Sequence, residues 1–218
     1  MNVSAFLAWD SGDRSGRPWQ LVDGVPQAMA PASRPHGAIL AELARLIGNH
    51  LLAHAPHCST VIEAGVVPRV RATTNVRIPD LAVTCSPSVP ERLLTDPILL
   101  VEILSPSNAD ETIANVWAYT TIPSVREILI VASTERRGEL LRRLPDGSWP
   151  ESPEAIGAEG SLTLESVGME LKLAEIYRTA ADDLRRATTG LPPRSANAGG
   201  GTPSGVQGAE PLAFFFLN

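Results

Sequence analysis

The sequence predicts one domain that mixes β-strands with α-helices, an α/β or α+β fold. Three observations predict it. Residues 98–104 and 127–132 are apolar runs of strand length, as in strands buried on both faces. Residues 35–53 carry apolar side chains at helical spacing. The composition then turns rich in Gly, Ser, Pro and Ala, so we expect the domain to cover residues 1–189 and residues 190–218 to form a disordered tail.

The expected elements begin with a hairpin over residues 19–29. Asp23-Gly24 supplies the positive φ angles that its tight turn requires. The first long helix follows, and the next hairpin turns around Pro145-Asp146-Gly147. Further strands are expected near residues 60–64, 66–72, 75–83, 98–104, 127–132, 139–144 and, as the last one, 162–164.

Two more helices complete the predicted order. Residues 108–120 form one of them, with Asn108 as a favourable N-cap. Glu111, three residues later, completes an arrangement like a capping box. The final helix is expected over residues 173–187, where apolar side chains recur on one side.

Two acidic residues stand on strands that are otherwise apolar. Asp80 precedes Leu81-Ala82-Val83, and Glu102 lies inside the run 98–104. A charged carboxylate in such a strand costs several kcal/mol of desolvation unless a metal ion, a basic partner or a shifted pKa compensates for it. Side chains on neighbouring strands lie roughly 5 Å apart, so both carboxylates could reach one hard divalent cation. The alternative is a structural ion pair with arginine.

Composition limits the possible functions. The net charge of −6 argues against a general nucleic-acid coat, although it allows a local basic groove. No apolar run is long enough to cross a bilayer, and the N-terminus lacks the pattern of a signal peptide, so we expect no membrane partner. Cys58 and Cys85 are expected to be buried free thiols in a reducing cytoplasm.

Three arginines precede the first of these acids. Arg69 and Arg71 would share one face of the expected strand 66–72, and Arg77 follows three residues before Asp80. They predict either a basic groove beside the acids or an exposed edge whose arginines favour solubility.

Several motifs, in this order, resemble the Uma-two family of putative restriction endonucleases, which belongs to the PD-(D/E)XK nuclease superfamily. The resemblance runs from residue 6 to about residue 188 and omits the tail. The pieces that carry it are Phe6-Leu7-Ala8-Trp9, Leu21-Val22-Asp23-Gly24, Met29-Ala30-Pro31, His36, Arg77-Ile78-Pro79-Asp80, Val101-Glu102-Ile103-Leu104-Ser105-Pro106-Ser107, Trp117-Ala118-Tyr119 and Pro123-Ser124-Val125-Arg126-Glu127.

This resemblance implies a restriction-endonuclease-like core, a mixed sheet flanked by helices with an N-terminal hairpin. It also implies Mg²⁺-dependent hydrolysis of nucleic-acid phosphodiesters, DNA above all, with Mn²⁺ as a substitute ion. Asp80, Glu102 and the backbone carbonyl of Ile103 would bind the ion. His36 matches a family histidine and would contact phosphate or assist the water; the alternative is a polar residue at a helix start without a role in the site. A homodimer would supply the two sites that cutting both strands requires.

Two positions depart from the family pattern. Gln20 stands where the family has a glutamate, and Asn115 stands where its lysine is expected, four residues before Tyr119. The only lysine in the sequence is Lys172. Losing a cation near a developing oxyanion costs about 3 kcal/mol of transition-state stabilisation. The alternative function is therefore a catalytically impaired relative that binds nucleic acid or a protein.

Other candidate groups have a structural explanation beside a functional one. His50, His54 and His57 lie on one helical side next to Cys58 and could hold zinc, but histidines near a helix C-terminus are also favoured by its dipole. Trp117 and Tyr119 are expected in the core, with Tyr119 able to hydrogen-bond near the acids.

Overall fold

The structure is a computed structural model that describes residues 1–87, 93–181 and 184. The expected tail, residues 190–218, and the last part of the expected final helix lie outside the described residues. In the part that is described, no helix is long and apolar enough to cross a membrane.

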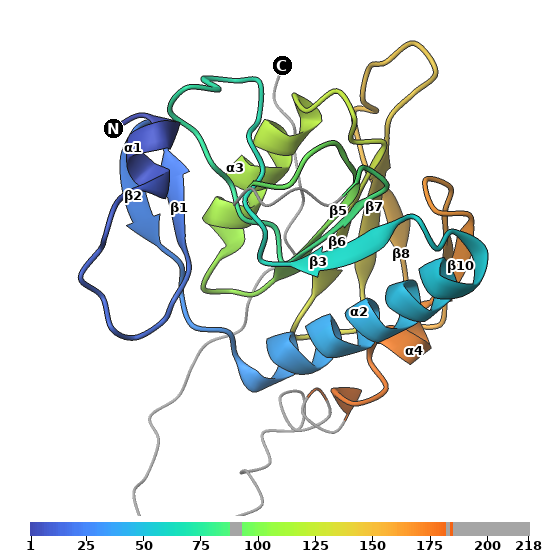
Figure 1. Ribbon diagram of the computed structural model, residues 1–218. Coiled ribbons are helices and arrows are strands. Elements are labelled where there is room, and N and C mark those ends of the chain that lie inside the picture. The colour runs from blue at the N-terminus through green and yellow to red at the C-terminus, as the bar shows by residue number, and fades with distance from the viewer. Residues whose placement is uncertain (88–92, 182–183, 185–218) are drawn as a thin grey trace, which may run out of the picture.

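A mixed sheet of six strands forms the centre of the fold, in the order β3-β4-β5-β6-β7-β8 (Figure 1). β5 and β6 run parallel, and every other neighbouring pair is antiparallel. The parallel pair needs a crossover, which α3 provides. The strands are β3 (Ser59–Ile62), β4 (Leu81–Thr84), β5 (Pro97–Leu104), β6 (Glu127–Ala132), β7 (Gly138–Arg142) and β8 (Glu154–Ile156).

The two long helices cover opposite faces of this sheet (Figure 1). α2 (Arg34–His54) packs its apolar stripe on the face that carries Leu99, Val101 and Ile103 of β5. α3 (Ala109–Thr120) packs on the face that carries Leu100. Because side chains alternate along a strand, Glu102 points to the α3 face with Leu100. A carboxylate thus stands in the core between the sheet and α3.

Smaller elements complete the structure. Helix α1 (Val3–Leu7) precedes the hairpin of β1 (Trp19–Val22) and β2 (Val25–Ala28). Reciprocal backbone hydrogen bonds join Leu21 of β1 to Val76, a few residues before Asp80. The remaining elements are a hairpin of β9 (Ser161–Leu164) and β10 (Met169–Lys172) and the short helix α4 (Leu173–Ile176). Of these, the β1–β2 hairpin matters most here because it brings Gln20 beside the sheet.

Most predicted elements are confirmed, and β6 has the predicted bounds. Several expectations are wrong. The helix expected over residues 173–187 ends as α4 at Ile176 and is followed by turns at residues 177–180, and the strand expected over residues 75–83 begins only at Leu81, as β4.

Residues 66–72 do not form a strand: Val66 makes one isolated bridge to Arg77, and the chain then turns. Residues 162–164 are not the last strand, because β10 follows and pairs with β9. Asn108 stands at the N-cap position of α3 but makes no capping bond, because its side chain binds the turn before it.

The expectation of free thiols is also wrong. Cys58 and Cys85 form a disulfide bond. β3 and β4 pair antiparallel with Ser59 opposite Thr84, so the next pair outward brings the two cysteines face to face. Sequence spacing cannot reveal this contact, because it depends on the register of the two strands.

Candidate active site

Asp80 and Glu102 meet on one face of the sheet. Leu81 pairs with Val101, so one residue further along this antiparallel register Asp80 stands opposite Glu102. Both side chains are nearly buried, with exposed fractions of 7% and 3%. Among the described residues, no arginine forms an ion pair with either carboxylate. The alternative of a structural ion pair with arginine is therefore not what the structure contains.

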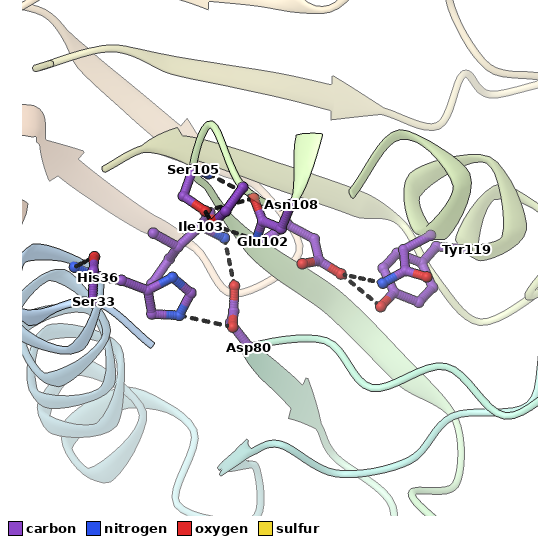
Figure 2. Close-up of polar contacts among 10 residues, drawn as sticks. Ser33, His36, Asp80, Glu102, Ile103, Ser105, Asn108 and Tyr119 are labelled. Carbon is purple, nitrogen blue, oxygen red and sulfur yellow. Dashed lines mark hydrogen bonds and ion pairs between the residues drawn. The ribbon is translucent and has the colours of Figure 1, made fainter. Parts of the chain in front are cut away.

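Asp80 is held from two sides. Its Oδ2 accepts a hydrogen bond of 2.6 Å from the backbone N–H of Ile103, the residue after Glu102. Its Oδ1 lies 3.0 Å from Nε2 of His36, in the first turn of α2 (Figure 2). The carbonyl of Ile103 accepts a hydrogen bond of 3.2 Å from Nδ2 of Asn108. A carbonyl oxygen has two lone pairs, so this bond leaves one acceptor position.

Two side chains of α3 donate hydrogen bonds to Glu102. The hydroxyl group of Tyr119 donates to Glu102 Oε1 over 2.7 Å, and the Asn115 amide donates to the same oxygen over 3.3 Å. Figure 2 shows the second carboxylate oxygen on the side that faces Asp80. Nη1 of the buried Arg77 donates to Oδ1 of Asn115 over 3.3 Å. Asn115 therefore connects a guanidinium to Glu102 without a direct ion pair.

This environment makes a charged Glu102 costly in the absence of a cation. Burial, and next the negative charge of Asp80, raise the pKa of Glu102 well above its ordinary value, although the bonds from Tyr119 and Asn115 oppose the rise. Burial and the nearby Glu102 also raise the pKa of the Tyr119 hydroxyl, which stays protonated and can donate. A positive ion between Asp80 and Glu102 would stabilise the charged form of Glu102 most.

A third carboxylate, that of Glu111, lies near this pair and lines the same cavity. Gln20 is fully buried, and its Nε2 donates to Glu111 Oε1 over 2.6 Å. Burial, and to a lesser extent Asp80, raise the pKa of Glu111, whereas Arg77 lowers it. Sequence reasoning assigned Glu111 to a capping box and missed this role. A signal was present, because Glu111 precedes Asn115 by four residues and shares its helix face.

A cavity of about 370 Å³ opens in front of these groups. Its walls include Asp80, Glu102, Glu111, Asn115 and His36. Of the side chains predicted for the site, Gln20 is the one that does not line the cavity. Gln20 contacts the site through Glu111. The lining also includes Glu63 and residues of the segments 15–18, 29–33 and 105–108. The buried acids thus face a space that a small ion and part of a substrate can enter.

The arginine cluster is divided. Arg71 is exposed and pairs with Asp23 of the first hairpin, and Arg69 is also exposed. Only Arg77 points into the site region, through Asn115. The prediction that Arg69 and Arg71 share one face of a strand is therefore wrong, because that segment forms turns. The prediction that Trp117 lies in the core is also wrong, since 54% of this residue is exposed. Tyr119 does lie in the core, and its hydroxyl group contacts Glu102 in the site.

The histidine cluster does not assemble as a ligand set. A ring nitrogen of His50 hydrogen-bonds the backbone carbonyl of Val167, and a ring nitrogen of His54 hydrogen-bonds the backbone carbonyl of His50. Only His57 lies within ligand distance of Cys58, together with Cys85, and the two sulfurs are joined in the disulfide.

Comparison with known proteins gives one family and one fold. The family model described as "Putative restriction endonuclease" (Uma2) matches residues 3–174. Among curated proteins, none matches the chain. A solved structure of a "putative nuclease belonging to DUF820" from Anabaena variabilis superposes with a TM-score of 0.65 at 13% identity. The match covers 82% of this chain and 98% of that one. It confirms the predicted fold, a mixed sheet flanked by helices, as one shared with that putative nuclease.

Proposed function

The chain belongs to the Uma2 family of putative restriction endonucleases, and from this premise we propose that it is a metal-dependent endonuclease that hydrolyses phosphodiester bonds of DNA. One observation supports this most: Asp80, directly before β4, and Glu102, on the neighbouring β5, share the wall of one cavity, and neither forms an ion pair with arginine among the described residues. Buried carboxylates that cost desolvation energy and have no guanidinium partner are expected where an ion binds.

The donor set fits Mg²⁺, with Mn²⁺ as a substitute. Asp80 and Glu102 would hold the ion through hard carboxylate oxygens, with the Ile103 carbonyl as the third ligand. The N–H of Ile103 and the ring of His36 orient Asp80, and Tyr119 and Asn115 orient Glu102. The chemistry that Mg²⁺ supplies when bound is a lowered pKa of a coordinated water and polarisation of a phosphoryl oxygen.

The other residues prepare the site for an anionic substrate. Arg77 places positive charge behind Asn115, where the family has a lysine, and thereby offsets part of the charge that builds up on phosphate. His36 lines the cavity next to Asp80 and can donate to a phosphate oxygen or to water. We propose that DNA is cut in both strands by a homodimer, because one such site hydrolyses one strand.

The experiment combines Mn²⁺ titration by calorimetry with a plasmid-nicking assay. The wild type should bind Mn²⁺ and nick the plasmid, and Asp80→Ala should lose both. Glu159→Ala, an exposed carboxylate outside the cavity, should change neither. Cleavage that survives Asp80→Ala would show that the active site lies elsewhere.

A second function is favoured by Gln20 and Asn115, the two replaced positions. The chain would then be an impaired nuclease that binds nucleic acid or a protein. Mn²⁺ binding without nicking would support this function, and absence of Mn²⁺ binding would contradict both.

A further inference from the structure

The replaced residue Gln20 has a specific partner. Its amide nitrogen donates to Glu111 over 2.6 Å, although 91 residues separate the two in the chain. Its Oε1 is buried and has no hydrogen-bond partner among the described residues. A buried side-chain amide that donates to a carboxylate fixes the position of that carboxylate, because an amide N–H donates only along a narrow range of directions.

The pair also accounts for the identity of residue 20. A glutamate there would lie against Glu111 at hydrogen-bond distance, and two carboxylates this close cannot both ionise readily. With glutamine at position 20, one negative charge remains in the pair, and it lies on α3. Glu111 lines the cavity together with Asp80 and Glu102, whereas Gln20 does not.

We propose that Glu111 contributes the third carboxylate of the metal site, in place of the acid that residue 20 lacks, and that Gln20 is its positioning residue. This inference rests on the proposed function. Glu111 reaches the site from the first turn of α3, and the same helix supplies Asn115 and Tyr119 to Glu102. Glu111 would thus add a carboxylate from a helix to the two carboxylates of the sheet, in a cavity that Glu63 also lines.

Mn²⁺ titration of the full chain tests this, with three variants. Glu111→Gln should weaken Mn²⁺ binding about tenfold or more, the range seen when groups that shape a metal site are lost. Asp110→Asn removes the neighbouring exposed carboxylate and should leave the affinity within about twofold. The exchange Gln20→Glu with Glu111→Gln restores one amide and one carboxylate in the pair but leaves the charge on residue 20, which does not line the cavity, so it should not recover the affinity.

The exchange separates a ligand from a structural residue. If Glu111 acted only through its bond to residue 20, the exchange would restore that bond and with it the Mn²⁺ affinity, and this result would overturn the ligand role of Glu111. Wild-type affinity in Glu111→Gln, with binding abolished in Asp80→Ala, would overturn the role of Glu111 and leave the proposed function intact. Failure of the wild type to bind Mn²⁺ would overturn both.

Discussion

The hydroxyl group of Tyr119 donates a 2.7 Å hydrogen bond to Oε1 of Glu102, from the fully buried face of α3. This bond stabilises the charged form of a carboxylate whose surroundings otherwise favour its protonation. It leaves the second carboxylate oxygen on the side of Asp80 (Figure 2). The tyrosine thus links core packing to the charge of the candidate site.

Tyr119→Phe should weaken Mn²⁺ binding several-fold near neutral pH. The ring keeps its place in the core, but Glu102 loses a bond worth about 1–2 kcal/mol to its charged form. Tyr177→Phe is the matched control, because the Tyr177 hydroxyl donates to backbone carbonyls of Ala132 and Arg137. That change should lower the melting temperature without altering Mn²⁺ affinity. Equal Mn²⁺ affinities for the two variants would contradict the role given to Tyr119.

Metal-free protein should lose stability through Glu102 as the pH rises. Burial and Asp80 place the pKa of Glu102 in the folded state well above its ordinary value of 4.5. Between these two values the folded protein binds more protons than the unfolded chain, so the free energy of unfolding falls with rising pH. Each pKa unit is worth about 1.4 kcal/mol. Glu102→Gln should therefore be more stable than wild type at pH 8 in EDTA, measured by urea unfolding.

Glu42 provides a control of opposite sign. It is also buried, and burial acts to raise its pKa, but bonds and charges from Arg45 and Arg178 lower it on balance. Glu42→Gln should therefore lose stability at pH 8, and this loss should shrink as the pH falls through the lowered pKa. If both glutamine variants destabilise the protein at pH 8, the charged form of Glu102 is not the costly one.

Asn115→Lys should raise the rate of plasmid nicking about tenfold or more. The substitution returns a cation beside Glu102 and the cavity, where charge develops on the phosphate. Single-turnover cleavage at saturating Mn²⁺ measures the effect apart from ion binding. An unchanged rate would mean that Arg77, which contacts Asn115, already supplies the charge.

Reduction of the Cys58–Cys85 disulfide should lower the melting temperature. The bond closes a loop between residues 27 positions apart, and a cross-link of that length is worth about 2–4 kcal/mol. Thermal unfolding with and without dithiothreitol measures it. The variant Cys58→Ser with Cys85→Ser should melt at the lower temperature in both conditions. A wild type that titrates with two accessible thiols before any reductant is added would contradict the pairing.

Local patterns predicted most elements and two of the acids. Apolar runs and helical spacing found β5, β6 and α2, because burial of one face imposes a period on the sequence. Asp80 and Glu102 stood out because a carboxylate is costly in an apolar strand. The identity of Gln20 and Asn115 as replaced positions came from the family resemblance. Strand 66–72 was mispredicted because apolar content alone does not distinguish a strand from a packed turn.

The sequence by itself determined that two carboxylates stand in or beside buried apolar strands, since hydrophobic patterning is local and each acid interrupts it. Only the tertiary structure decided what surrounds them. The bond between Gln20 and Glu111, the contact of Arg77 with Asn115 and the pairing of Cys58 with Cys85 join residues far apart in the chain. Such contacts depend on strand register and helix docking, which arise from packing the whole domain and leave no period in the sequence.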